Sequence, residues 1–140
     1  MHNWGAIFDV DGTMVDNAAF HESAWVELGR RRGFPITPEY YRTQLHARCN
    51  ERIAKILIGE HATADQIAGI ADEKEAIYRD SFRPHLKEIP GLAALLRMLR
   101  AEGVPLAAAS NSPRGNVDFV LDGLAIRGYF DSVIDRDAVQ

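Results

Sequence analysis

Two aspartates, Asp9 and Asp11, lie two positions apart near the start of the chain. They follow the apolar run 5–8 (GAIF), which is typical of a buried strand, and precede Gly12, which allows a tight turn. Two carboxylates this close repel each other unless they share a proton or a cation. Mg²⁺ (magnesium) relieves that repulsion, because it prefers oxygen ligands and tolerates retained water and substrate phosphate. We therefore expect Asp9 and Asp11 to bind Mg²⁺, with Thr13 supplying a hydroxyl and a backbone amide; a solvated turn is the alternative interpretation.

A second polar segment, Ser110-Asn111-Ser112, follows the apolar run 105–109 (PLAAA) and precedes Pro113. Proline favours the first turn of a helix, and the hydroxyls and free amides of a helix N-terminus bind anions. The same residues are good helix caps, and both roles can hold together. Polar residues that follow parallel strands meet at the carboxyl edge of a sheet. Carboxylates, a cation and a phosphate-binding turn at one edge suit phosphoryl transfer through an aspartyl-phosphate.

The elements that must position these residues form two patterns. Apolar residues recur at helical spacing within residues 20–28, 53–57 and 67–77, and again after Pro90-Gly91 up to a terminating Gly103. Residues 130–134 are a weaker candidate for a third strand. Strand–helix–strand units at both ends therefore enclose a helical insert over residues 17–86. The fold class is α/β, with a Rossmann-like parallel sheet and an inserted α-helical domain.

Composition limits the classes of protein that remain. The 140 residues are 46% hydrophobic and 26% charged, enough for one globular core, and the net charge of −4 argues against a general nucleic-acid binder. No run approaches the ~18 apolar residues that span a membrane, and the first residues do not resemble a signal peptide. Cys49 is the single cysteine, which excludes an intramolecular disulfide and a cysteine-rich zinc site. We expect a cytoplasmic location and leave any protein partner open.

The two polar segments resemble known motifs. Residues 9–13 (DVDGT), followed by Val15-Asp16, resemble the first motif of the haloacid dehalogenase-like (HAD) superfamily, and the run ending in Ser110-Asn111 resembles the second. The helical insert is similar to the cap domain of the β-phosphoglucomutase and small-phosphatase branch. The resemblance implies a cap over residues 17–86 that closes over the active site of a core formed by residues 1–16 and 87–140.

The resemblance also implies a role for each motif residue. Asp9 would be the nucleophile, and its carboxylate would bind Mg²⁺ together with the backbone carbonyl of Asp11. The Asp11 side chain would be the general acid and then the general base. Ser110 would hydrogen-bond the transferring phosphoryl group, assisted by the Asn111 amide. A carboxylate at position 11 favours a phosphatase or phosphomutase over a dehalogenase.

Two residues of the insert match substrate-binding positions of the mutase branch. His21 would contact the catalytic acid and the substrate, and Lys74 matches a cap lysine. A packed helix histidine and a solvated helix lysine are the alternatives. The same branch carries an arginine where this chain has Asn50, and some mutases carry valine at the position of Thr13. Both differences favour hydrolysis over isomerisation.

One part of the family pattern is absent. The family places a lysine and an acidic pair C-terminal to Ser110, whereas the chain's three lysines, Lys55, Lys74 and Lys87, all precede it. We therefore expect a core that is incomplete at its C-terminus, with about three strands, an unpaired edge and exposed apolar surface.

The expected function is that of a Mg²⁺-dependent phosphohydrolase acting on small phosphorylated metabolites, with sugar phosphates favoured. A β-phosphoglucomutase-like phosphomutase is the alternative. A further alternative is a catalytically incomplete fragment that acts only in binding.

Overall fold

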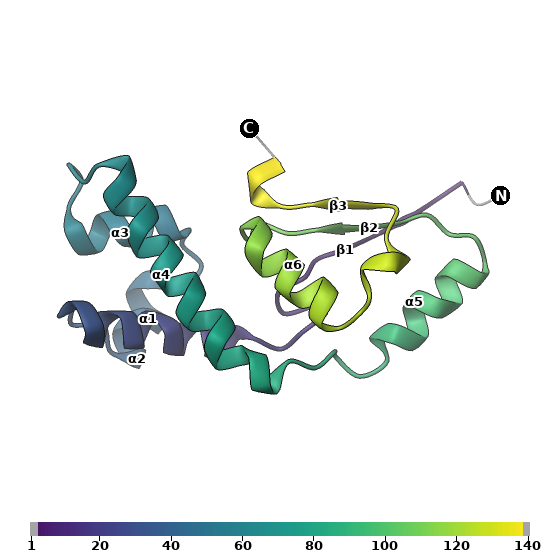
Figure 1. Ribbon diagram of the computed structural model, residues 1–140, viewed down its shortest axis with the longest axis horizontal. Coiled ribbons are helices and arrows are strands. Elements are labelled where there is room, and N and C mark those ends of the chain that lie inside the picture. The colour runs from purple at the N-terminus through teal and green to yellow at the C-terminus, as the bar shows by residue number, and fades with distance from the viewer. Residues whose placement is uncertain (1–2, 139–140) are drawn as a thin grey trace. The chain divides into compact units, whose positions relative to one another are not determined.

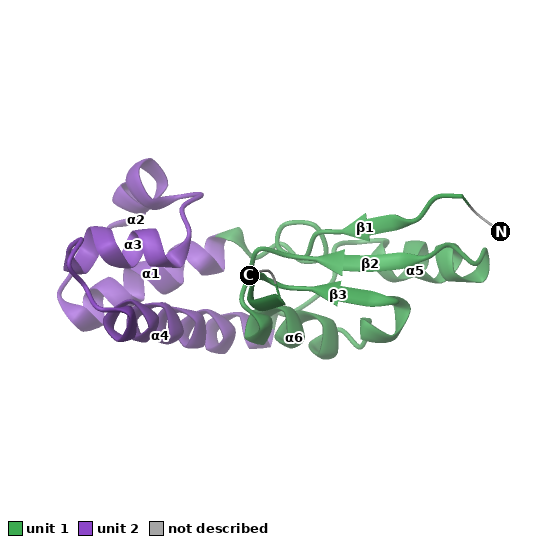
Figure 2. Cartoon of the chain, turned by 90° about the horizontal axis from the view of Figure 1, so that it is seen from above, with its two compact units in different colours: residues 1–18, 85–140 green, residues 19–84 purple. Residues whose placement is uncertain are grey.

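The structure is a computed structural model that describes residues 3–138. The chain forms two units, a core unit made of Met1–Ala18 and His85–Gln140, and a helical unit made of Ala19–Pro84 (Figure 2). The sequence placed these boundaries after residues 16 and 86. In the described residues, no helix combines the length and the apolar character that a membrane span requires.

The core unit is built on a three-stranded parallel sheet in the order β1-β2-β3 (Figure 1). Its strands are β1 (Ala6–Phe8), β2 (Leu106–Ala109) and β3 (Ser132–Ile134). Helix α5 (Leu92–Ala101) precedes β2, and helix α6 (Arg114–Gly123) connects β2 to β3. These elements confirm the α/β class and the parallel sheet.

The two faces of the sheet differ in burial. Leu106 and Ala108 of β2 are 1% and 0% exposed. On the opposite face, Ile7 of β1 is 76% exposed and Ile134 of β3 is 44% exposed. The chain passes from β1 to β2 and then from β2 to β3, each time to the next strand in the same direction across the sheet. Because connections between parallel strands are right-handed, α5 and α6 lie on the same face of the sheet. Among the described residues the other face stays open.

The helices of the core unit bury one apolar stripe each. Leu92, Leu96 and Leu99 of α5 are spaced for one helical face and are buried, as the spacing predicted. Fully burying such a side chain contributes about 1.5–3 kcal/mol. Gly103 has φ 73° and ends the helix in the left-handed conformation expected there. Pro113 lies one position before the helix, at the N-cap of α6, and not in its first turn.

The helical unit contains four α-helices within the described residues. They are α1 (Ala18–Arg32), which begins at the unit boundary, α2 (Pro38–Tyr40), α3 (Asn50–Ile58) and α4 (Ala64–Phe82), with a π-helical turn over Tyr41–Leu45. Trp25 of α1 and Tyr78 of α4 are 1% and 0% exposed and form the centre of its core. A capping box between Thr63 and Gln66 starts α4, because each side chain accepts the other residue's backbone N–H.

Candidate active site

Asp9 lies immediately beyond the carboxyl end of β1, at the start of a tight loop. The Val10 carbonyl accepts hydrogen bonds from the amides of Met14 at 2.9 Å and Thr13 at 3.3 Å. Gly12 makes this turn possible with φ 71°, a conformation that L side chains adopt only with strain. Asp9 Oδ1 accepts the Val10 amide at 2.7 Å, and the rest of its side chain is exposed. The loop therefore presents the Asp9 carboxylate at the edge of the sheet.

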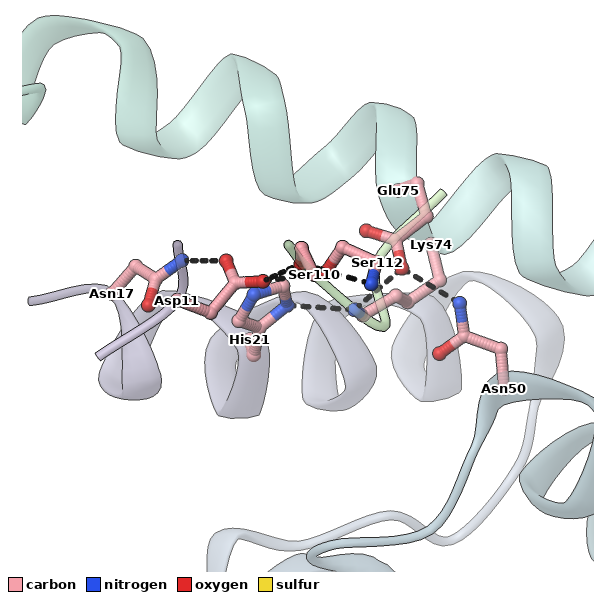
Figure 3. Close-up of polar contacts among 8 residues, drawn as sticks. All are labelled: Asp11, Asn17, His21, Asn50, Lys74, Glu75, Ser110 and Ser112. Carbon is pink, nitrogen blue, oxygen red and sulfur yellow. Dashed lines mark hydrogen bonds and ion pairs between the residues drawn. The ribbon is translucent and has the colours of Figure 1, made fainter. Parts of the chain in front are cut away.

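Asp11 is fixed by donors from two other segments of the core unit (Figure 3). Its Oδ1 accepts Asn17 Nδ2 at 2.6 Å. Its Oδ2 accepts the Ser112 hydroxyl at 2.5 Å and the Ser110 hydroxyl at 3.4 Å. These donors set the orientation of the Asp11 carboxylate, which is what a positioned acid or base requires.

The segment after β2, residues 110–112, is also stabilised by a hydrogen bond within it. The Ser112 amide donates to Ser110 Oγ at 3.1 Å, so this hydroxyl receives one hydrogen bond and donates another. The Ser110 amide donates to the Ile134 carbonyl at 2.9 Å, which connects the segment to β3. Ser110 is thereby held by β3 and by Asp11 in the loop that follows β1.

A cavity of about 540 Å³ brings the two predicted motifs together in the core unit. Its lining residues are Asp9, Ala109, Ser110, Asn111, Ile134 and Arg136. Asp9, Ser110 and Asn111 thus meet at the carboxyl edge of the sheet. Thr13 is exposed and is not part of this lining, and its amide serves the turn; its proposed contact with phosphate stays a prediction.

In the helical unit, Lys74 and His21 meet in a polar network. Lys74 is 3% exposed, and its Nζ lies 2.8 Å from His21 Nδ1 and 3.1 Å from Glu75 Oε1 (Figure 3). Asn50 Nδ2 donates to the same Glu75 oxygen at 2.6 Å. An ammonium can only donate, so His21 Nδ1 is the acceptor in this contact. The ring stacks on Tyr78 with centroids 4.0 Å apart.

Sequence reasoning missed three residues of the site and of the polar network: Asn17, Glu75 and Arg136. Ser112 belongs to the predicted second segment, but its hydrogen bond to Asp11 was not predicted. Arg136 follows the third predicted strand, so the topology places it at the same sheet edge. The sequence gives no indication that Asn17 and Glu75 are buried, because a polar residue on a helix or at its end is usually exposed.

The donors of the core unit fit a magnesium ion only in part. Among residues 3–138, no group of three or more His, Cys, Asp or Glu side chains gathers as a metal site would require. Mg²⁺ typically takes one or two carboxylates and completes its shell with water and substrate phosphate. The exposed Asp9 carboxylate at the cavity supplies one such ligand, which is compatible with this mode of binding.

A protein-family model described as haloacid dehalogenase-like hydrolase matches residues 5–140. The chain belongs to this family. The match confirms the family that the sequence indicated.

Curated HAD-like relatives include phosphatases. Phosphoglycolate phosphatase of Pseudomonas putida is 29% identical over 140 residues, which cover 95% of this chain and 50% of the relative. A phosphorylated carbohydrates phosphatase of Thermotoga maritima is 25% identical over 134 residues, which cover 96% of this chain and 62% of the relative.

Solved structures share the fold. A HAD hydrolase of family IA from Entamoeba histolytica matches with a TM-score of 0.87 and 24% identity, over 98% of this chain and 63% of that one. CbbY from Rhodobacter sphaeroides, solved with xylulose-(1,5)bisphosphate, matches with a TM-score of 0.76 and 25% identity, over 95% and 63%. The chain thus spans between half and two thirds of the length of these four proteins.

Proposed function

We propose that this HAD-like chain carries the nucleophile and phosphate-binding segments of a phosphohydrolase for small phosphorylated metabolites, sugar phosphates above all. The observation that carries the proposal is the cavity shared by Asp9, Ser110 and Asn111. A phosphatase acting on phosphorylated carbohydrates among the relatives supports the substrate class.

In the proposed reaction, an Asp9 oxygen attacks the phosphorus of the ester, and the alcohol leaves as an aspartyl-phosphate forms. The Asp11 carboxyl gives its proton to the leaving oxygen and then takes a proton from the water that hydrolyses the aspartyl-phosphate. Asn17 and Ser112 hold Asp11 in one orientation during both steps. When the ester binds, the Ser110 hydroxyl turns from its 3.4 Å contact with Asp11 and donates to a phosphoryl oxygen, together with the Asn111 amide.

We propose that the Asp9 carboxylate and the Asp11 backbone carbonyl would hold Mg²⁺. The ion would offset negative charge on the phosphoryl group and the nucleophile.

His21 and Lys74 are proposed substrate-binding residues of the helical unit. His21 Nδ1 lies 2.8 Å from Lys74 Nζ, so we infer that the ring contacts a phosphate or sugar oxygen through Nε2. Glu75 offsets the charge of the buried ammonium, so the pair stays in place without a ligand.

The test is phosphate release from p-nitrophenyl phosphate and from a panel of sugar phosphates at millimolar Mg²⁺. We expect turnover by the chain and its loss in Asp9→Asn, which keeps the size of the side chain but removes the nucleophile. Asp72→Asn changes an exposed aspartate of α4 in the same way and should leave turnover intact. No turnover by the folded chain with any ester would contradict the proposal and favour a role in binding only.

A phosphomutase is the second candidate, favoured by the 2.8 Å contact between His21 and Lys74 at positions that match the mutase branch. Isomerisation of β-glucose 1-phosphate that requires a sugar bisphosphate would select it. Release of inorganic phosphate from the same ester without isomerisation would select the phosphatase.

A further inference from the structure

Glu75 of α4 accepts hydrogen bonds from two neighbours in the helical unit, and both donors reach the same oxygen. Glu75 Oε1 lies 2.6 Å from Asn50 Nδ2 and 3.1 Å from Lys74 Nζ (Figure 3). The side chains of Lys74 and Glu75 are only 3% and 8% exposed. Burying a carboxylate is costly unless it is paired and hydrogen-bonded, and the two donors meet that requirement. The charge of Glu75 therefore acts on its neighbours in a place that water hardly reaches.

The ammonium of Lys74 lies close to two aromatic rings. Its Nζ is 5.7 Å from the centre of the Trp25 ring and 5.6 Å from the centre of the Tyr78 ring, within the range of cation–π attraction. Both rings are buried, with Trp25 1% and Tyr78 0% exposed. Burial among apolar groups disfavours the charged form of a lysine, and a carboxylate in contact with it favours that form. Glu75 supplies this carboxylate, so we expect it to keep Lys74 a cation and to hold it in place.

The contacts of Lys74 extend to the imidazole ring of His21. Lys74 Nζ lies 2.8 Å from His21 Nδ1, so the ammonium holds the ring at this nitrogen. The ring also stacks on Tyr78, with centroids 4.0 Å apart and an angle of 9° between the planes. The stacking sets the plane of the ring, and the contact with Lys74 sets which edge of the ring faces α4. The orientation of His21 therefore depends on the position of Lys74.

Two interpretations of Glu75 fit these contacts. In one, Glu75 only ties α3 to α4 through Asn50, the first residue of α3. In the other, its charge holds Lys74 against His21, in the way that a third group orients a functional histidine in many enzymes. The buried position of Lys74 favours the second interpretation, because a tie between two helices needs a hydrogen-bond acceptor but no charge.

We propose that Glu75 is a positioning residue whose charge holds the Lys74 ammonium against His21 and so sets the orientation of the imidazole ring. The inference rests on the proposed function for the ligand, because His21 is the proposed contact to a phosphate or sugar oxygen. It adds a residue that neither sequence motif includes. All the contacts that carry it lie within the helical unit.

The first test observes the ring itself and needs no ligand. Long-range proton–nitrogen NMR spectra, recorded at about pH 8, where an ordinary histidine is neutral, distinguish an accepting ring nitrogen from a protonated one. The chain has five histidines, and the signals of His21 are those lost in His21→Gln. In the unchanged chain, Nδ1 of His21 should be an acceptor, and the Lys74 side chain should give the signal of an ammonium. A protonated Nδ1 or a neutral Lys74 amine would overturn the proposal without any further variant.

Three variants separate the charge of Glu75 from its hydrogen bonds. Glu75→Gln keeps an oxygen that can accept from Asn50 but removes the charge. Asn50→Ala removes the tie to α3 but leaves the charge. Glu60→Gln is the matched control, because it removes the same charge from an ion pair in which Arg52 is 50% and Glu60 is 61% exposed. Circular dichroism checks that every variant is folded.

We expect Glu75→Gln to shift the Nδ1 signal of His21 and to weaken the ammonium signal of Lys74. Asn50→Ala should shift the His21 signal less, and Glu60→Gln should leave it unchanged. An unchanged His21 signal in folded Glu75→Gln would overturn the proposal. Equal shifts in Glu75→Gln and Asn50→Ala would also overturn it, because the tie between the helices, and not the charge, would then orient the ring.

The second test measures ligand binding. Isothermal titration with glucose 6-phosphate at millimolar Mg²⁺ uses Asp9→Asn as the parent chain, since the proposed nucleophile is then absent and the ester is not consumed. Adding Glu75→Gln should weaken binding about threefold to tenfold, which is typical of losing one well-placed hydrogen bond, and adding Glu60→Gln should leave the affinity unchanged.

The two tests separate this inference from the proposed function. If the parent chain binds the ester and Glu75→Gln leaves the affinity unchanged, the inference is overturned. If the parent chain binds no ester while the NMR signals change as expected, the proposed substrate contact of His21 fails alone and the positioning role of Glu75 stands.

Discussion

Replacing Asn17 by aspartate tests the environment of Asp11 with almost no change in shape. Asn17 is 1% exposed, and its Nδ2 donates to Asp11 Oδ1 at 2.6 Å. Asn17→Asp replaces this donor with a carboxylate that faces another carboxylate. Two unit charges about 4 Å apart repel by roughly 4 kcal/mol at an effective dielectric constant of about 20. Sharing one proton reduces the penalty, so we expect the variant to lose about 2–4 kcal/mol of unfolding free energy at pH 7.

The stability lost in Asn17→Asp should increase as the pH rises. Repulsion raises the pKa of the carboxyl pair in the folded variant above the value of about 3.9 found in an unfolded chain. The variant is therefore as stable as the unchanged chain below about pH 4, where both carboxyls are protonated in either state, and loses stability as the pH rises. Urea unfolding followed by circular dichroism at pH 4 and pH 7 measures the difference.

Asn3→Asp is the matched control, because it adds the same charge at an exposed position of the core unit. The reasoning is refuted if the two variants lose equal stability at pH 7. It is also refuted if the deficit of Asn17→Asp relative to the unchanged chain is the same at both pH values.

Three further substitutions test the core unit. Ile7→Thr should change the unfolding free energy by no more than about 0.5 kcal/mol, because this side chain is 76% exposed, whereas Leu106→Ala at a 1% exposed position should cost about 2–5 kcal/mol; urea unfolding measures both. Asp131 accepts the Leu106 amide at 2.9 Å and pairs with Arg100 at 2.8 Å, and these contacts lower the pKa of its carboxyl. A lowered pKa stabilises the fold above about pH 4 and stops doing so as the pH falls through the folded-state value. Asp131→Asn should therefore lose less stability than the unchanged chain between pH 5 and pH 2, and equal losses would contradict this role.

The fold was accessible from the sequence because its signals are local. A short apolar run before Asp9, a second run before Ser110 and helical spacing between them predict parallel strands with a helical insert. The position of Gly103 also predicted the end of α5, since a left-handed residue there needs no partner from elsewhere in the chain. Both features depend on neighbours in the sequence.

The contacts of the site were less accessible, because they join distant positions. Lys74 and His21 are separated by 53 positions, and their 2.8 Å contact depends on how α1 and α4 pack. Which oxygen of Asp11 binds Ser112, 101 positions away, depends on the register of β1 and β2. Spacing predicts which edge of the sheet such residues share, but not which atoms meet.

The most direct measurement is to trap the phosphorylated residue. The chain is mixed with a phosphate ester, quenched within its first turnover and treated with borohydride, which reduces an acyl phosphate on aspartate to homoserine. Peptide mass spectrometry then locates the homoserine among the aspartates at positions 9, 11 and 16, with Asp9→Asn as the control. We predict homoserine at position 9 alone and none in the control. Homoserine at position 11 or 16, or turnover with no reduced residue at all, would contradict the role of Asp9 as nucleophile.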